Sequence, residues 1–490
     1  MTLINNNMTD KEKSYHHILK CISVFGGVQG LNILIGLVRN KIVAVLLGPE
    51  GMGLISLFNS TLNLVSSSTN LGITSSAVRE ISGDFDRQDS DRIENTVKIV
   101  RSWSFLTALV GMLLCMAFSQ ILNDITFTWG DHTLHFVLLS PIIAMLAVTG
   151  GETAILKGLR KLRQLAKIQV YAALITLVTT VPIYYYYGES GIVPSLLLFS
   201  LISMSLTIYY SFRLCPLRIS FSRSVLSQGS GMVKLGIAFV VAAIMGSGAE
   251  FAIRTFLNRT ASLDVVGLYN AGFMMTMTYA GMIFSAMDTD YFPRLSAIGD
   301  NRTKQNNTVN NQISVSVLLI SPLLVAFMLG MPFILPLLFS GKFMPVIGMM
   351  QITVIAMFLR AVKLPLAYIN IAKGNSTAYM ILEGVCAIVQ VLSVILGYRL
   401  GGLTGTGAAL LVTGLFDLIM LMVYTNIRYG YSMSKAVVAV VLSQLPVILF
   451  SYAVTFYHVC LWYWIISFMM TVVSSFVSYY LYRNTSRIPS

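Results

Sequence analysis

The sequence has few charged residues and few cysteines. Only 11% of its 490 residues are charged, whereas a soluble domain carries about 25%. The five cysteines stand singly and the five histidines form no cluster, so no pair has the spacing of a metal site or a redox motif. A soluble protein, a disulfide-stabilised domain and a metal centre are therefore excluded, and the cysteines are interpreted as small packing residues.

The sequence also lacks a Walker motif, a glycine-rich phosphate loop and any long polar external loop. ATP is therefore not the direct energy source. The connections predicted to be external are very short, for example Pro49-Glu50-Gly51 and Gly188-Glu189-Ser190. They leave no room for a catalytic domain outside the membrane, so no enzymatic activity is expected.

Hydrophobic residues make up 56% of the chain and gather in runs long enough to cross a bilayer. The pattern predicts an all-α polytopic membrane protein with about 14 transmembrane helices. The runs cover residues 19–47, 53–78, 100–123, 134–156, 166–187, 191–212, 232–256, 265–287, 313–338, 345–372, 376–398, 403–427, 436–457 and 461–482.

The net charge of +13 follows from where Lys and Arg occur. They concentrate in alternate connections, as the positive-inside rule requires of cytoplasmic loops. This asymmetry explains the basic character without a nucleic-acid partner. It also predicts that both termini lie in the cytoplasm, with the polar residues 1–18 as an N-terminal tail rather than a cleavable signal.

The order of the runs predicts two six-helix lobes and a C-terminal helix pair. The lobes are expected at residues 19–213 and 232–427, with a cytoplasmic linker at 214–231 and the pair within 428–490. A weak repeat supports this division: Arg39 precedes the run Gly53-Leu54-Ile55-Ser56 by 14 residues, and Arg254 precedes Gly267-Leu268-Tyr269-Asn270 by 13. Both runs follow a helix of the same direction, so the repeat would be parallel.

Cations within apolar runs are the main functional signal. A cation at bilayer depth costs at least roughly 2.5–3.5 kcal/mol and usually faces the interior of a bundle. Several in one chain predict a cavity for an anion. The candidate binding residues are Arg39, Arg254, Arg360 and Lys363.

Polar stripes on the first two runs, 19–47 and 53–78, predict that this cavity is aqueous. Asn32 lies on one helical face with Arg39. The further candidates for the cavity lining are Gln29, Asn59, Asn63 and Asn70. The alternative is that these amides only join helices to one another, a contact worth about 0.6 kcal/mol; that alternative does not account for the charged residues.

Three acids are candidate coupling groups or charge partners: Glu250, Glu383 and Asp417. Glu250 and Arg254 are one helical turn apart and are predicted to pair, either as a structural ion pair or as one that opens on binding. Arg360 and Lys363 share a helical face without a nearby acid in sequence, so an anion or an acid on another helix must compensate them. Asp417 is either a carboxylate that couples to an ion or the partner of one of these cations.

Four stretches resemble the polysaccharide-flippase branch of the multidrug/oligosaccharidyl-lipid/polysaccharide (MOP) exporter superfamily, and Wzx-type O-antigen translocases in particular. They are RNKIVAVLLGPEGMGLIS from Arg39 to Ser56, VVGLYN from Val265, YFPRLS from Tyr291 and FSGKF from Phe339. Arg39 matches an arginine typical of the first helix in the lipid-flippase branches, and the Arg254 region matches its counterpart in the second lobe. Many Wzx-type proteins have only twelve helices. In having two helices beyond twelve, this chain is similar to the lipid II flippase.

The resemblance implies two six-helix lobes around a cationic cavity. It implies transport of an undecaprenyl-diphosphate-linked oligosaccharide from the inner to the outer leaflet of the bacterial cytoplasmic membrane by alternating access. No resident cofactor is expected, Na⁺ or H⁺ are candidate coupling ions, and membrane lipids and polysaccharide polymerase or assembly proteins are candidate partners. The alternatives are a cation-coupled multidrug exporter, which should carry an acid in its first helix, and a membrane glycosyltransferase or polymerase, which should carry a large external loop.

Overall fold

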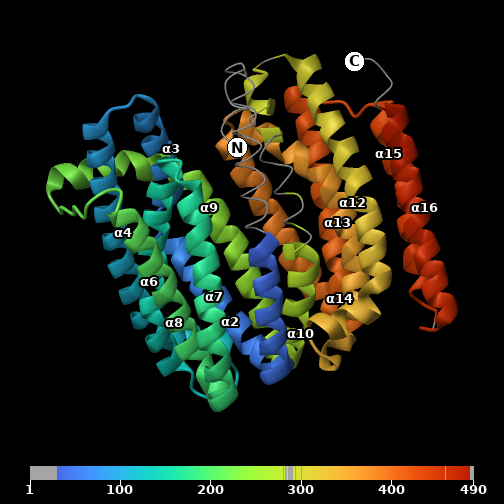
Figure 1. The fold of residues 1–490 in the computed structure, drawn as a ribbon, viewed down its shortest axis with the longest axis horizontal. Helices are drawn as coiled ribbons and strands as arrows, with labels where there is room; N and C mark the ends of the chain where they lie inside the picture. The colour runs from blue at the N-terminus through green and yellow to red at the C-terminus, as the bar shows by residue number, and fades with distance from the viewer. Residues whose placement is uncertain are drawn as a thin grey trace, which may run out of the picture. The chain divides into compact units, whose positions relative to one another are not determined.

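A computed structural model of the chain describes residues 30–279, 281, 284, 291–292, 294–299, 301–457 and 459–485. Helix is the regular secondary structure of these residues throughout (Figure 1). Nine segments of the described part are long and apolar enough to span a membrane. The prediction of an all-α polytopic membrane protein is therefore confirmed.

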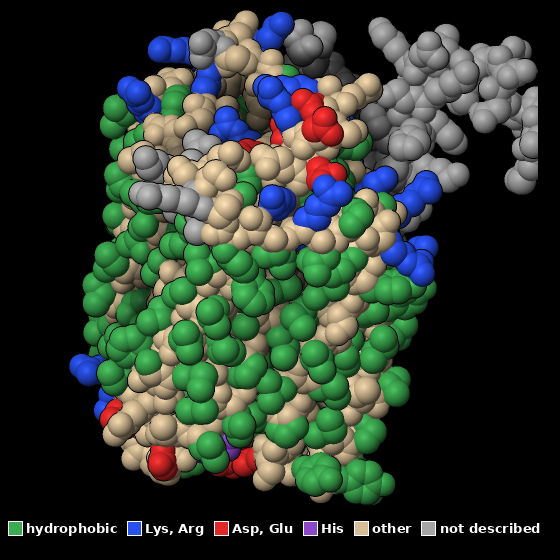
Figure 2. All heavy atoms as spheres, turned by 90° about the vertical axis from the view of Figure 1, so that its left-hand side faces the viewer, with side chains coloured by type: hydrophobic (Ala, Val, Ile, Leu, Met, Phe, Trp, Pro, Cys, Tyr) green, Lys and Arg blue, Asp and Glu red, His purple; other side chains and the backbone are tan. Residues whose placement is uncertain are grey.

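The predicted number of 14 spans stays a prediction, because two of these nine segments are composite. Arg163–Phe212 contains α7 (Leu162–Tyr187), a short 3₁₀ turn and α8 (Ile192–Phe212). Ser376–Tyr429 is assigned as the single helix α14, but the backbone at Gly401 and Gly402 is not helical. Figure 2 shows the expected surface on one face, with a broad hydrophobic band and most Lys and Arg side chains gathered at one end.

The chain divides into two compact units that alternate along the sequence. The first takes in the described residues up to Ile42, then Thr69–Ser119 and Thr133–Ile237. The second takes in Val43–Ser68, Gln120–His132 and the described residues from Ala238 onward. The lobe boundaries predicted from the sequence stay a prediction.

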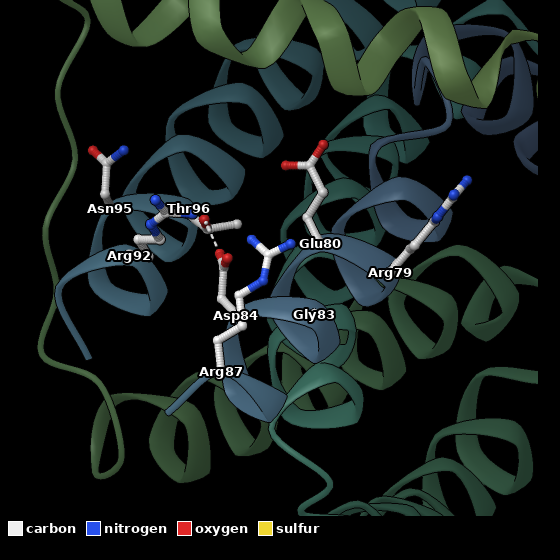
Figure 3. A pocket seen from close by; sticks show the side chains of 8 residues that line it. All are labelled: Arg79, Glu80, Gly83, Asp84, Arg87, Arg92, Asn95 and Thr96. Atoms are coloured by element: carbon white, nitrogen blue, oxygen red, sulfur yellow. Dashed lines mark hydrogen bonds between the residues drawn. The ribbon is translucent and has the colours of Figure 1, made fainter. Parts of the chain in front are cut away.

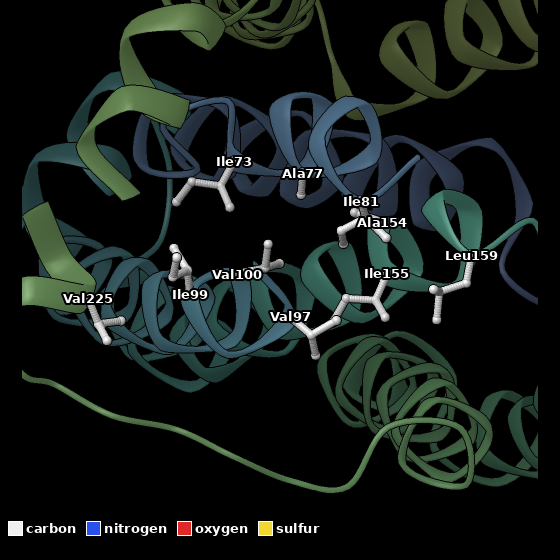
Figure 4. Close-up of a cluster of buried hydrophobic side chains, with 10 residues drawn as sticks. All are labelled: Ile73, Ala77, Ile81, Val97, Ile99, Val100, Ala154, Ile155, Leu159 and Val225. Carbon is white, nitrogen blue, oxygen red and sulfur yellow. The ribbon is translucent and has the colours of Figure 1, made fainter. Parts of the chain in front are cut away.

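The first unit contains the helical residues 30–42, α7, α8 and three further helices: α3 (Ile73–Asp86), α4 (Ser90–Ala117) and α6 (Thr133–Gly158). Its core lies where α3, α4 and α6 meet. Figure 4 shows this cluster of buried aliphatic side chains, which includes Ile81, Val100 and Ile155 together with Val225 from the start of α9 (Arg223–Thr260). Helix α9 thus begins before the predicted residue 232, and its first turns fold onto α4.

Two predicted helices have different bounds for local reasons. The run 53–78 is interrupted, because α2 (Gly48–Thr69) ends before a turn in which Leu71 and Gly72 both adopt positive φ. Helix α4 begins at Ser90 rather than residue 100, since the Asp89 side chain caps it by accepting a hydrogen bond from the Arg92 amide at 3.1 Å. Hydropathy detects the apolar part of a helix and misses such polar first turns.

The second unit contains α2, most of α5 (Ser119–Thr126) and of α9, and the helices from α10 onward. These are α10 (Leu263–Phe273), a π-helical turn (Met274–Tyr279), α12 (Arg302–Leu338), a 3₁₀ turn (Gly341–Val346), α13 (Ile347–Ala372), α14, α15 (Lys435–Val454) and α16 (Leu461–Thr485).

Helix α14 folds into a hairpin against α13. Gly402, at φ +56°, makes the reversal, and Gly397 and Gly405 then approach so closely that neither has room for a Cβ. Both halves of α14 consequently face the same partner helix.

The C-terminal pair packs on α12 and on itself. The buried Gln444 of α15 donates to Ser478 at 2.9 Å and accepts from Ser474 at 3.1 Å. The buried Tyr463 of α16 donates to the Leu329 carbonyl of α12 at 2.7 Å. These bonds fix the position of the pair within the second unit.

Candidate functional site

Arg39 lines a cavity of about 440 Å³ inside the first unit. Its helix is polar on one side, and the cavity lies between this helix and α6, α7 and α8. The guanidinium carbon is 5.9 Å from the centroid of the Phe199 ring. The hydroxyl and amide groups around it come from Asn32, Thr149, Thr153, Gln169, Ser203 and Thr207.

The electrostatics of this cavity favour an anion. No described residue that lines it is acidic, and Arg39 forms no ion pair with a described residue. Asn32 donates to the Gln169 carbonyl oxygen at 3.2 Å, while its own carbonyl oxygen is buried without a hydrogen-bond partner. A guanidinium away from bulk water binds an anionic oxygen strongly, and the surrounding hydroxyls and amides suit a ligand rich in hydroxyl groups.

Arg254 is fully engaged within the second unit. It donates to Ser56 Oγ at 2.7 Å, to Glu250 Oε2 at 3.1 Å and to Asn270 Oδ1 at 3.3 Å. Its side chain is 8% exposed, and its guanidinium lies 5.9 Å from the Phe273 ring centroid. The predicted pairing with Glu250 is present, together with two neutral acceptors on α2 and α10.

Lys363 of α13 lies between two carboxylates of α14. It forms a close ion pair with Asp417, on the second half of α14, and a longer one with Glu383 on the first half, at 3.9 Å. Of the two predictions for Asp417, the pairing with a cation is the arrangement found. The carboxylates share Lys363 because the Gly401–Gly402 reversal brings both halves of α14 onto α13.

Arg360 and Lys363 lie three residues apart but contact different neighbours. The Arg360 guanidinium approaches the Met277 sulfur at 3.9 Å and lies close to Gly281. The structure therefore directs Arg360 toward the segment that follows α10, and Lys363 toward α14.

The three asparagines predicted from the run 53–78 to line the cavity, Asn59, Asn63 and Asn70, do not stay together. Asn59 and Asn63 remain on one exposed face of α2. Asn70 lies beyond the end of α2, in the turn before α3, where it donates to Thr74 at 3.4 Å. Gln29 lies outside the described residues.

The sequence did not predict a buried ion pair in the first unit. Arg101 of α4 and Glu152 of α6 are almost fully buried and 2.8 Å apart, and Ser211 of α8 donates to the same carboxylate at 2.5 Å. Arg101 also donates to the carbonyls of Cys215 and Pro216 at 3.1 and 2.6 Å. The signal that could have found this pair is Arg101, a cation at the start of the predicted span 100–123.

A second pocket of the first unit, of about 460 Å³, opens between α3 and α4 (Figure 3). Three arginines and two acids line it: Arg79, Arg87, Arg92, Glu80 and Asp84. Asp84 accepts a hydrogen bond from Thr96 at 2.8 Å. Burial, and then the charge of Asp84, raise the pKa of Glu80 above its usual value. With charges of both signs, this pocket is less suited to an anion than the one around Arg39.

A family model described as polysaccharide biosynthesis protein matches residues 42–348 of the sequence. The chain belongs to the polysaccharide biosynthesis protein family. The matched region takes in most of the elements described above, from α2 to the start of α13. No curated protein matches the sequence significantly.

Solved structures of MOP transporters share the fold. The lipid II flippase MurJ, in an inward closed conformation, matches with a TM-score of 0.75 over 94% of this chain and 99% of its own, at 14% identity. An inward-facing multidrug transporter of the MATE family matches with a TM-score of 0.65 over 84% of this chain and 98% of its own, at 16% identity. A MOP transporter from Pyrococcus furiosus matches at 0.61, over 84% and 96%, at 14% identity.

Proposed function

We propose that this protein is a flippase for a lipid-linked oligosaccharide in polysaccharide biosynthesis. In the proposed reaction, it moves an undecaprenyl-diphosphate-linked glycan from the inner to the outer leaflet of the bacterial cytoplasmic membrane by alternating access. Both termini lie in the cytoplasm. We also propose that the protein is a translocase of the Wzx type, the O-antigen translocases that its sequence motifs resemble.

One observation carries the proposal: the Arg39 cavity has a cation, many hydroxyl and amide groups, and no acid among its described lining residues. The diphosphate would bind Arg39, and sugar hydroxyls would bind Asn32, Gln169 and the threonines. Family membership supports a substrate from polysaccharide biosynthesis. The second unit is proposed to contribute positive charge through Arg254, Arg360 and Lys363. Its acids would set how much of that charge is available to the substrate; they are Glu250, Glu383 and Asp417.

The structural matches support a flippase over a multidrug exporter. The MurJ structure covers about a tenth more of this chain than the MATE structure does, roughly the length of α15 and α16 together. An exporter that exchanges cationic drugs for Na⁺ or H⁺ should carry an acid in its first helix, and the run 19–47 has none. Coupling to either ion stays part of the proposal.

Translocation by the purified protein in proteoliposomes would test this. The substrate would be a fluorescent undecaprenyl-diphosphate oligosaccharide, and the readout its accessibility to a quencher that cannot cross the bilayer. We expect Arg39→Ala to slow translocation at least about tenfold, since a charge-assisted hydrogen bond contributes about 1.5–3 kcal/mol. Lys41→Ala, two residues away on another side of the same helix, should retain the rate.

Equal rates for wild type and Arg39→Ala would contradict the assignment of the cavity. If the wild type moved no diphosphate-linked glycan but exported cationic drugs, the flippase proposal itself would be wrong.

A further inference from the structure

A basic cavity of about 700 Å³ lies at one end of the second unit, where α12, α13 and α14 begin or end. Arg302, Lys373 and Arg428 line it, and no described residue of its lining is acidic. Neither Arg302 nor Arg428 forms an ion pair with a described residue. Three positive charges therefore share one solvent-accessible hollow at the ends of these helices.

The fold brings these cations together from separate elements. Arg302 is the first residue of α12, Lys373 follows the last residue of α13, and Arg428 lies in the last turn of α14. The N-termini of α12 and α14 meet here, capped by Asn301 and Asn375. Helices α13 and α14 also end here, so the positive potential of the two N-termini is offset by two C-termini, and the side chains supply the positive charge of the cavity.

Gln305 gives an independent indication of a ligand. The residue is 3% exposed and its side-chain amide nitrogen is buried without a hydrogen-bond partner, although buried donors are rarely left unpaired. Gln305 and Lys373 line this cavity and also a neighbouring one of about 200 Å³. Gln305 thus lies in the wall that the two hollows share.

We propose that this cavity is a binding site for a phosphate-bearing group. Its oxygens would accept hydrogen bonds from the Gln305 amide and charge-assisted bonds from Arg302, Arg428 and Lys373. The group is either the headgroup of an anionic membrane lipid, which would lie at this level of the spans, or a soluble phosphate or diphosphate compound. The site shares no residue with the Arg39 cavity and does not depend on the proposed cargo.

Binding measurements on the full-length protein would test the site with two probes. Inorganic pyrophosphate would be titrated calorimetrically in phosphate-free detergent solution. Affinity for anionic lipid would be compared in nanodiscs of phosphatidylcholine with and without phosphatidylglycerol. The variants are Arg302→Gln with Arg428→Gln, both exposed positions, and Gln305→Leu; Arg399→Gln, an exposed arginine beside Phe256 at the other end of the first half of α14, is the matched control.

We expect pyrophosphate or phosphatidylglycerol to bind wild type and Arg399→Gln equally. The double variant should bind at least about tenfold more weakly, and Gln305→Leu should also weaken binding. If the variants bind pyrophosphate more weakly than wild type does, the ligand is a soluble phosphate compound or a diphosphate. If they differ from wild type only in nanodiscs, the ligand is a lipid headgroup. Either result supports the site. If neither probe binds the wild-type protein, the proposal is wrong. It is also wrong if the double variant is folded and binds both probes as tightly as the wild type does.

Discussion

Gly53 of α2 and Gly267 of α10 pack backbone to backbone within the second unit. A Cβ at Gly53 would collide with the Leu263 carbonyl, and a Cβ at Gly267 would collide with the Pro49 carbonyl. Gly53 lies four residues after Pro49, and Gly267 lies four residues after Leu263. The contact is therefore reciprocal, as between two segments related by a two-fold axis. The two equivalent glycines of the sequence repeat therefore form one contact.

Replacing either glycine by alanine should destabilise the protein. Neither α2 nor α10 can move away without breaking the reciprocal contact, and overpacking of this kind costs about 1–3 kcal/mol. We expect a lower melting temperature in detergent for Gly53→Ala and Gly267→Ala. Gly246→Ala in α9 is the control, because open space surrounds that glycine and alanine favours a helix by about 1 kcal/mol. Equal melting temperatures for all three variants would contradict the contact.

Arg254 joins the two repeat motifs at their ends. Ser56 and Asn270 stand at equivalent positions, each three residues after its glycine, and Arg254 donates to both. Three acceptors in fixed directions require the planar fork of a guanidinium.

Arg254→Lys should therefore lose stability although it keeps the charge. An ammonium cannot reach Ser56, Glu250 and Asn270 together, and each lost bond to a charged group costs about 1.5–3 kcal/mol. Thermal unfolding of the purified variants measures this. The exposed Arg259, in the last turn of the same helix, provides the matched Arg259→Lys control. A Lys variant at 254 as stable as wild type would mean that charge alone matters there.

The sequence predicted what depends on local spacing. Apolar runs identified the membrane helices, and the one-turn spacing of Glu250 and Arg254 predicted their ion pair, which the structure contains. The reciprocal contact of Gly53 and Gly267 lies in the repeat that the motifs indicated. In each case the relevant residues are neighbours on one helix or equivalent positions of a repeat.

Contacts between helices far apart in sequence could not be predicted. Lys363 meets Glu383 and Asp417 only because α14 reverses at Gly402, and two adjacent glycines in an apolar run do not specify the direction of that reversal. Arg101 and Glu152 likewise pair across two helices. Hydropathy also treats an N-capped polar turn as a loop, so the first turns of α4 were missed.

The Lys363 cluster should behave as a coupled unit. Asp417→Asn removes the close partner of a largely buried ammonium, and breaking such a pair costs about 3–5 kcal/mol. Glu383→Gln removes the longer and more exposed contact, so we expect a smaller loss of stability. Combining Lys363→Met with Asp417→Asn should recover part of the loss, because the buried cation is then removed with its close partner and only the more exposed Glu383 is left without its ion pair.

A double-mutant cycle on the free energy of unfolding tests this coupling. If the effects of Lys363→Met and Asp417→Asn simply add, the two side chains do not pair in the folded protein.

Two cysteines test the proposed orientation in the membrane. Cys215 follows α8, and the exposed Cys460 lies between α15 and α16. By the positive-inside rule these positions face the cytoplasm and the exterior, respectively. In single-cysteine variants, an impermeant maleimide added to intact cells should label Cys460 and leave Cys215 unlabelled until the cells are permeabilised.

Even then Cys215 should react slowly, with a rate that continues to rise to a higher pH than the rate of a free thiol does. Burial raises the pKa of the Cys215 thiol, an effect that the nearby Arg101 charge opposes, so less thiolate is present at neutral pH. Since the thiolate is the reacting form, each step up in pH below that pKa should increase the rate of Cys215 labelling. Labelling of Cys215 in intact cells would reverse the proposed orientation, and a pH profile equal to that of a free thiol would contradict the raised pKa of Cys215.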